Sequence, residues 1–249
     1  MVLESTVVRT CICQALCPAF ILALDKSVSP GGNFDFSIWE LQLCTGSPGS
    51  PDTKSSSSLE GDFGYEDDAH FYTSNTDGAL VMKVPGSPSS SGCVTTKNSE
   101  HCRTELRELG SWDPSEGVNK MVVQVAVVKA DDSEHGTVIG QIHIDDSVST
   151  KPVIELYYNS QGTISTGVEQ TLSGGNEKLT TFETTISLNT QFTYEIDYSG
   201  GSLKVTVNGE EMTPDTYELD NPKSYFKAGN YNQGSSASEV HFYSIDVQH

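Results

Sequence analysis

Basic side chains are scarce in this sequence. Among its 249 residues, 14 are Lys or Arg and 34 are Asp or Glu, so the formal net charge is −20 at pH 7. A protein that binds nucleic acid presents a basic face to the phosphates, and this charge balance argues against that class of function. The overall field would also repel a polyanionic substrate, but salt screens that field beyond about 10 Å at 0.1 M. A local cluster of cations can therefore still bind an anion at contact range.

The sequence also lacks a repeat of fixed period, a long amphipathic helix and an apolar run long enough to anchor it in a bilayer. The longest apolar stretch, residues 10–24, has the length of the hydrophobic region of a secretory signal. We therefore expect residues 1–23 to be a signal peptide cleaved after Ala23, and the protein to be secreted and extracellular. A structured N-terminal extension is the alternative, because Glu4 offsets Arg9 and Pro18 interrupts the apolar stretch. No membrane contact is expected for the mature chain, residues 24–249.

Cysteine pairs with the spacing of a zinc site are absent, since Cys11-Ile12-Cys13 has the wrong separation. Once the leader is removed, three cysteines remain. Cys93 and Cys102 bracket a short loop, and a disulfide between them is plausible on entropic grounds. Cys44 is then left over. If the leader is retained, a Cys17–Cys44 pair becomes possible, and the spacing does not decide between these pairings.

Short segments with the alternation typical of β-strands run through the rest of the chain. Residues 121–128 are nearly all apolar and fit a strand buried on both faces. Residues 192–198 and 203–207 alternate strictly, and Asn208-Gly209 is a hairpin signal. Further strands are expected at residues 39–43, 71–72, 79–84 and 240–247, with flexible Ser/Gly/Pro-rich loops at 45–58 and 85–92. The pattern predicts one all-β domain over residues 24–249, a two-sheet antiparallel β-sandwich of jelly-roll type.

Three strand-like segments far apart in the chain carry polar side chains on alternate positions. They are Arg103-Thr104-Glu105-Leu106-Arg107-Glu108, Gln141-Ile142-His143-Ile144 and residues 225–233. Because every second side chain of a strand points to the same side, the groups that share a face are Arg103, Glu105 and Arg107; Gln141 and His143; and Tyr225, Lys227 and Tyr231. Side by side in one sheet, they would form a platform suited to an anionic sugar chain whose carboxylate must be neutralised while a proton is moved.

Taken together and in this order, the three segments closely resemble the signature regions of the alginate lyases of polysaccharide lyase family 7. The resemblance runs from about Asn33 to the C-terminus and includes Trp39-x-Leu41-x-Leu43. Asn230 departs from the family pattern, which usually has an apolar residue such as Val there. The resemblance implies β-elimination within alginate, an anionic polysaccharide, by a monomeric enzyme that needs no metal and no other cofactor.

Roles for individual residues also follow from the resemblance. Arg103 and Gln141, with His143 close by, would neutralise the carboxylate and so stabilise the charge that develops when the C5 proton leaves. His143 or Tyr231 would remove that proton, and Tyr231 would protonate the leaving oxygen. Lys227 would lower the pKa of this tyrosine or bind a carboxylate, and Glu105 would orient the arginines by bidentate pairing. The expected substrate-binding residues are Arg107, Glu105, Lys227, Tyr225, Asn232 and Gln233.

Two other functions remain open at this point. Glu195 and Asp197 resemble part of the carboxylate pair of a sandwich-fold glycoside hydrolase, although alternation also explains them as a solvent-facing pair. A non-catalytic carbohydrate-binding module could use the same platform. The residues themselves specify only a polyuronate. In the family, an Ile at the position of Ile142 accompanies activity on guluronate-containing or mixed blocks. An open cleft and endolytic cleavage are expected.

Overall fold

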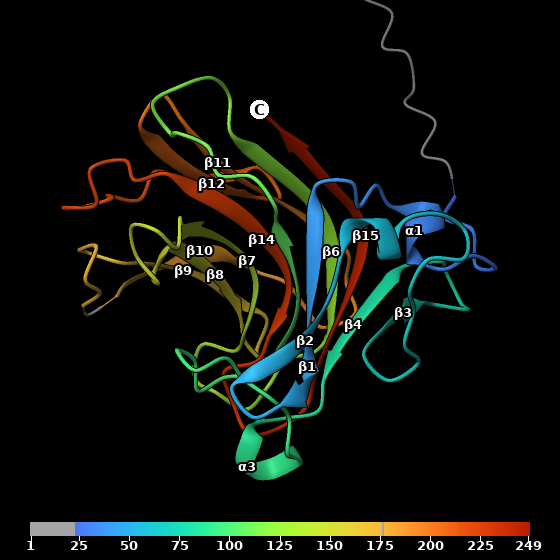
Figure 1. The fold of residues 1–249 in the computed structure, drawn as a ribbon. Helices are drawn as coiled ribbons and strands as arrows, with labels where there is room; N and C mark the ends of the chain where they lie inside the picture. Colours follow the sequence, from blue (N-terminus) through green and yellow to red (C-terminus); the bar gives the residue numbers. More distant parts are fainter. Residues whose placement is uncertain (1–22, 176) are drawn as a thin grey trace, which may run out of the picture.

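The computed structural model describes residues 23–175 and 177–249, and apart from Ala23 the expected signal peptide lies outside them. Two antiparallel sheets form the two layers of a β-sandwich (Figure 1). This confirms the fold class expected from the alternation. Within the described residues, no helix is long and apolar enough to cross a membrane.

The two sheets have eight and seven strands. In spatial order, the eight-stranded sheet contains β10 (Lys178–Thr185), β9 (Thr163–Val168), β8 (Pro152–Tyr158), β7 (Thr137–Ile144), β14 (Ser224–Tyr231), β5 (Arg103–Glu108), β1 (Trp39–Ser47) and β2 (Ser50–Lys54). The seven-stranded sheet contains β13 (Glu210–Met212), β12 (Ser202–Val207), β11 (Phe192–Ser199), β6 (Lys120–Lys129), β15 (Ser238–Gln248), β4 (Leu80–Val84) and β3 (Phe71–Thr73). Three short helices, α1 (Pro30–Asn33), α2 (Ser56–Leu59) and α3 (Pro88–Ser91), lie in the connections.

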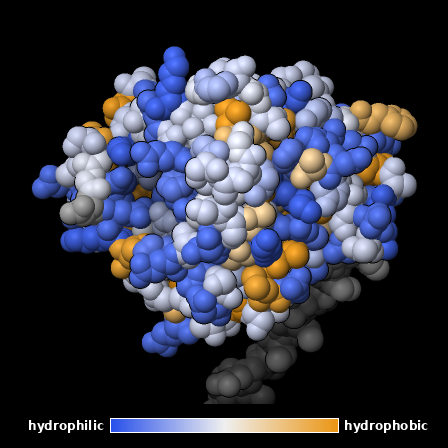
Figure 2. Space-filling view, turned by 90° about the horizontal axis from the view of Figure 1, so that it is seen from below, coloured by the Kyte–Doolittle hydropathy of each residue, from blue (hydrophilic) through white to orange (hydrophobic). Residues whose placement is uncertain are grey.

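The core lies between the sheets and is built from the apolar half of each alternating strand. On β11, Phe192, Tyr194, Ile196 and Tyr198 are buried, whereas the residues between them are partly or fully exposed. Tyr194 reaches the opposite sheet, where its hydroxyl donates to the carbonyl of Ile139 at 2.9 Å. A side chain at Gly140 would meet this hydroxyl, since a Cβ there would lie 2.5 Å from it. The outer surface is mainly hydrophilic, and Figure 2 shows apolar residues scattered in small patches over one face.

The expectation of a flexible loop over residues 45–58 is wrong. This stretch holds the end of β1, the edge strand β2 and helix α2. Gly46 and Gly49 have φ angles of 123° and 76°, which let the chain turn sharply into β2. Pro51 is tolerated because β2 is at the edge of its sheet, where a missing N–H leaves no partner unpaired. Residues 85–92 likewise contain the short helix α3.

Asn230, the departure from the family pattern, joins the two sheets. Its side chain is fully buried on the core face of β14. The amide donates to the carbonyl of Met82 on β4 at 3.0 Å, and the Oδ1 atom accepts from the hydroxyls of Thr137 and Ser238, each at 2.7 Å. All three partners lie within the interior. Their hydrogen bonds offset the cost of burying a polar side chain where the family usually has an apolar one.

We predict that Asn230→Val lowers the free energy of unfolding by about 2–3 kcal/mol, because it leaves buried polar groups without their partner. Denaturant unfolding measures this. A variant as stable as the wild type would contradict the account of these bonds.

Candidate active site

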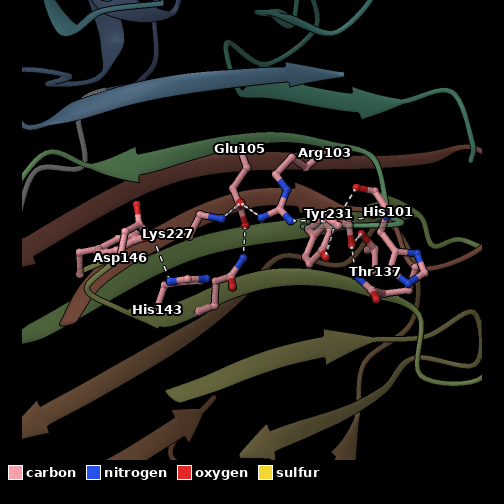
Figure 3. A network of polar contacts seen from close by, with 12 residues as sticks. His101, Arg103, Glu105, Thr137, His143, Asp146, Lys227 and Tyr231 are labelled. Atoms are coloured by element: carbon pink, nitrogen blue, oxygen red, sulfur yellow. Dashed lines mark hydrogen bonds and ion pairs between the residues drawn. The ribbon is translucent and has the colours of Figure 1, made fainter. Parts of the chain in front are cut away.

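The three polar segments are neighbouring strands, with β14 between β7 and β5. In the register of the sheet, Tyr225 lies opposite His143, and Tyr231 lies opposite Arg103. Lys227 lies between Gln141 on one side and Arg107 on the other. The face predicted from alternation is therefore continuous across the three strands, on the side turned away from the core (Figure 3).

A cleft of about 680 Å³ lies over this face. The residues that line it are Glu40, Gln42, Thr96, Asn98, Ser99, His101, Arg103, Arg107, Gln141, His143, Asp146, Thr150, Lys151, Pro152, Glu155, Glu169, Glu177, Tyr225, Lys227, Tyr231 and Gln233. They come from strands β1, β5, β14, β7 and β8 of the eight-stranded sheet and from the loops beside them. The cleft thus crosses the strands of the sheet, as a groove for an extended chain must.

Glu105 is the centre of the polar network on the cleft floor. Its carboxylate is 1% exposed and contacts Arg103 Nη1 at 3.0 Å, Lys227 Nζ at 2.5 Å and Gln141 Nε2 at 2.5 Å. Burial alone would raise the pKa of Glu105, but the two cations outweigh burial and lower this pKa below its usual value. Two cations share one carboxylate, so the cluster keeps one positive charge for an anionic ligand.

Arg107 is not oriented by Glu105, contrary to the sequence-based expectation. Its guanidinium donates to Asp146 at 2.8 Å and lies 4.4 Å from the centre of the Tyr225 ring. The side chain of Glu105 points between Arg103 and Lys227 instead. Alternation assigns these residues to one face, but it does not determine which of the neighbouring cations a carboxylate reaches.

Tyr231 is held by a cation and by a loop. The Arg103 guanidinium lies 3.6 Å from the centre of its ring, and its hydroxyl is 3.0 Å from Ser99 Oγ. Burial raises the pKa of Tyr231, and the nearby Arg103 opposes part of this rise. The phenol is therefore protonated at neutral pH. The cation that lowers this tyrosine's pKa is Arg103, beside its ring, whereas Lys227, to which one of the two expectations gave that role, is bound to Glu105.

Ser99 reaches Tyr231 because the loop before β5 is closed by the Cys93–Cys102 disulfide. The structure confirms this pairing, and among the described residues Cys44 is buried and has no disulfide partner; the alternative partner Cys17 lies outside them. Ser99 Oγ also accepts from the Arg103 guanidinium at 3.3 Å. The disulfide therefore fixes the loop that completes one end of the network.

His143 stands at the other end of the network in Figure 3. Its Nδ1 atom is 2.8 Å from the carbonyl of Ile144 and 3.0 Å from the hydroxyl of Tyr225. A carbonyl can only accept, so Nδ1 carries the proton and Nε2 is left as the acceptor of the ring. Burial, assisted by the charge of Lys227, lowers the pKa of His143 to about 4. The imidazole is thus neutral and able to accept a proton.

Two of the residues singled out in the sequence do not reach the cleft. Asn232 is buried on the core side, where its amide donates to Ser236 at 2.8 Å and Ser238 at 2.9 Å. The expectation that Asn232 binds substrate is therefore wrong. Neighbouring side chains point to opposite sides, so Asn232 faces the core while Tyr231 faces the cleft. Ile142 also faces the core and is fully buried, whereas Gln233 lines the cleft as expected.

Several cleft residues were not recognised in the sequence. His101 packs edge-on against Tyr231, with ring centres 6.1 Å apart. It stands two positions before Arg103, so alternation was an available signal. Asp146, Glu155 and Glu177 line the cleft from loops and strands that carry no family motif. Among the described residues, no cluster of His, Cys, Asp or Glu is arranged to hold a metal ion.

Comparison with known proteins identifies one family. A family model described as alginate lyase matches residues 34–249. An alginate lyase of Klebsiella pneumoniae is 26% identical over 291 residues, covering 89% of this chain and 91% of the relative. The crystal structure of alginate lyase A1-II′, a member of polysaccharide lyase family 7, is 30% identical with a TM-score of 0.75, covering 89% of this chain and 98% of that one.

Two further structural comparisons bear on the site. An alginate lyase of Pseudomonas aeruginosa is 28% identical, with a TM-score of 0.72 and coverage of 86% of this chain and 99% of that one. Variants of A1-II′ have been crystallised in complex with a product (GGG) and with a substrate (GGMG).

We predict that Glu105→Gln lowers the free energy of unfolding by about 3 kcal/mol or more, because it leaves two buried cations without their carboxylate. The matched change Asp146→Asn removes the partner of Arg107 at the rim, where the Asp146 side chain is 60% exposed. It should cost less than about 1 kcal/mol. Denaturant unfolding of both variants checks this, and equal losses would contradict the central role of Glu105.

Proposed function

The chain belongs to the alginate lyases of polysaccharide lyase family 7, and on that premise we propose that it is a secreted, endolytic enzyme that cleaves the 1,4-glycosidic bonds of alginate by β-elimination. The observation that carries this proposal is the pairing of a neutral His143 and a protonated Tyr231 around a cluster with one surplus positive charge. That combination can bind a carboxylate and exchange protons on both sides of it.

The reaction begins with neutralisation of a uronate carboxylate. The C5 proton is only weakly acidic, and its removal places negative charge on the carboxylate. Gln141, beside His143 on β7, and Arg103, beside Tyr231, lie on the cleft floor and supply an amide and a cation for that charge. Stabilising the developing charge with donors already in place contributes several kcal/mol to the lowering of the barrier.

Proton transfer completes the elimination. His143 Nε2 takes the C5 proton, the C4–C5 double bond forms as the C4–O4 bond breaks, and Tyr231 gives its proton to O4. The phenolate left on Tyr231 is stabilised by the Arg103 guanidinium 3.6 Å from its ring centre. For mannuronate, where the proton and the leaving group are on the same side, Tyr231 would serve as base as well only after ionising, and burial, which raises its pKa, opposes that ionisation.

Several observations support the finer parts of the proposal. The cleft crosses strands from Glu40 on β1 to Glu155 on β8, which favours binding within a long chain and hence endolytic cleavage. The Cys93–Cys102 disulfide favours an oxidising, extracellular setting. The A1-II′ complexes favour alginate oligosaccharides as ligands. A preference for guluronate-containing or mixed blocks rests on Ile142, which can act only through the packing of β7 because it is buried in the core.

The two rival functions lose support from the geometry. Glu195 and Asp197 are on β11 of the seven-stranded sheet, whereas the cleft lies on the eight-stranded sheet. They therefore do not flank a sugar bound in the cleft, as a hydrolase would require. A binding module would have no use for an imidazole with a free acceptor beside the cation cluster.

The deciding experiment follows ultraviolet absorbance during incubation with polymannuronate, polyguluronate and glucuronan. Elimination makes an unsaturated, absorbing product, and Tyr231→Phe should lower kcat by about 10²–10⁴-fold while leaving oligouronate affinity within a few fold. Tyr243→Phe is the matched control, since this hydroxyl bonds Asp77 outside the cleft. Reducing ends without absorbance would indicate a hydrolase, and binding without either signal would indicate a binding module.

We further predict that the acidic limb of the kcat/KM profile lies near pH 4. Burial lowers the pKa of His143 to about 4, so the ring accepts a proton above that pH and loses this ability below it. An exposed histidine would place the limb at about pH 6.5. Samples returned to pH 7 before assay separate titration from acid unfolding. A limb near the ordinary histidine value would contradict His143 as the base.

A further inference from the structure

The charge of the side chains on the cleft floor changes from positive to negative beyond Gln141. In the register of the sheet, Gln141 on β7 lies opposite Glu155 on β8, and Glu155 lies opposite Gly167 on β9. Lys227 and Arg107 continue the same row in the other direction, on β14 and β5. One half of the row is therefore cationic and the other half carries carboxyl groups. An extended chain that crosses the sheet has to pass over both halves.

Glu155 and Glu177 form a carboxyl pair bridged by one phenol. The hydroxyl of Tyr157 is 2.7 Å from Glu155 Oε2 and 3.0 Å from Glu177 Oε2. A phenol has one proton and can donate to only one of them. The second short contact is satisfied when the other carboxyl is protonated and donates to the phenol oxygen. Burial raises the pKa of both carboxyls, and their mutual repulsion raises that of Glu177 further, so one shared proton is retained.

Gly167 makes room for this arrangement. A Cβ at this position would lie 2.5 Å from both carboxylate oxygens of Glu177 and 2.3 Å from the carbon between them. The Glu177 carboxyl therefore occupies the space above the sheet that a side chain would fill. The charged and titratable groups acting on the pair are Arg103 and Glu105 on β5, Lys227 on β14, Tyr157 on β8 and Glu169 after β9. The two cations that act on Glu155, Arg103 and Lys227, already share Glu105.

We propose that the Glu155–Glu177 pair, held by Tyr157 and Gly167, is an electrostatic stop that keeps uronate carboxylates off the β8–β9 part of the floor. It limits the number of sugars that bind on that side of the cleavage point. The pair keeps one negative charge beside the path of the substrate, and a uronate carboxylate placed over it is repelled. Binding is thereby concentrated on the cationic half. This inference rests on the proposed function, because it assigns a specificity role within the same cleft.

The test measures kcat/KM for saturated oligouronates of increasing length by the absorbance of the unsaturated product. The quantity compared is the ratio of kcat/KM for an octamer to that for a tetramer. The double change Glu155→Gln/Glu177→Gln removes the one negative charge of the pair and should raise this ratio about tenfold over the wild type, whereas either single change leaves one ionised carboxylate in place. Glu195→Gln on β11 makes the same change in net charge away from the cleft and should leave the ratio unchanged.

Gly167→Ala provides a second route that keeps both carboxyls. The added methyl separates the Glu177 carboxyl from Glu155, so the shared proton is no longer held, both carboxyls ionise, and the ratio should fall. A ratio equal to that of the wild type in both the double variant and Gly167→Ala would overturn the proposal. A loss of kcat/KM that is equal for both lengths would also overturn it, since it would indicate a structural role. Failure of the proposed function would differ from both, because the wild type would then form no unsaturated product at any length.

Discussion

The active-site cleft depends on one buried carboxylate. Glu105 binds Arg103, Lys227 and Gln141 at once, and these three side chains come from three different strands. Without it, two cations would face each other in a site that burial makes costly for charge. With it, the strands are joined by charged hydrogen bonds and one positive charge remains for the substrate. His143 and Tyr231 take their protonation states from the same surroundings, since Lys227 acts on the first and Arg103 on the second.

The sandwich supports this cluster from beneath with polar groups of its own. On the core side of β5, Glu108 accepts from the backbone of Phe226 at 2.8 Å and the indole of Trp112 at 3.0 Å, and lies 2.6 Å from His249 at the C-terminus. Asn230 links β14 to the opposite sheet. The same strands thus carry catalytic groups on one face and anchoring groups on the other. Alternation makes this division possible within segments of six to eight residues.

The sequence predicts the β-sandwich and the strand face that carries the active site, but it does not predict which side chains in the site contact one another. Strands β5, β7 and β14 are recognisable because each alternates and together they match a family signature. Strands β8, β9 and β10 were not predicted from the sequence. Strand β10 is mostly polar and exposed, and β9 contains Gly167. Their carboxyl groups were missed with them. Which cation meets Glu105, and whether Asn232 turns inward, depends on neighbours distant in sequence, and a pattern read along one strand does not contain that information.

The most direct test of this account is a crystal structure of the Tyr231→Phe variant bound to an oligouronate. The account predicts that the carboxylate of the reacting sugar contacts Gln141 and Arg103, with its C5 atom turned toward His143 Nε2. It also predicts O4 beside the position of the missing hydroxyl. A sugar whose carboxylate lies instead on Lys151 or Arg107, with C5 turned away from His143, would contradict the assignment of the base and of the cation cluster.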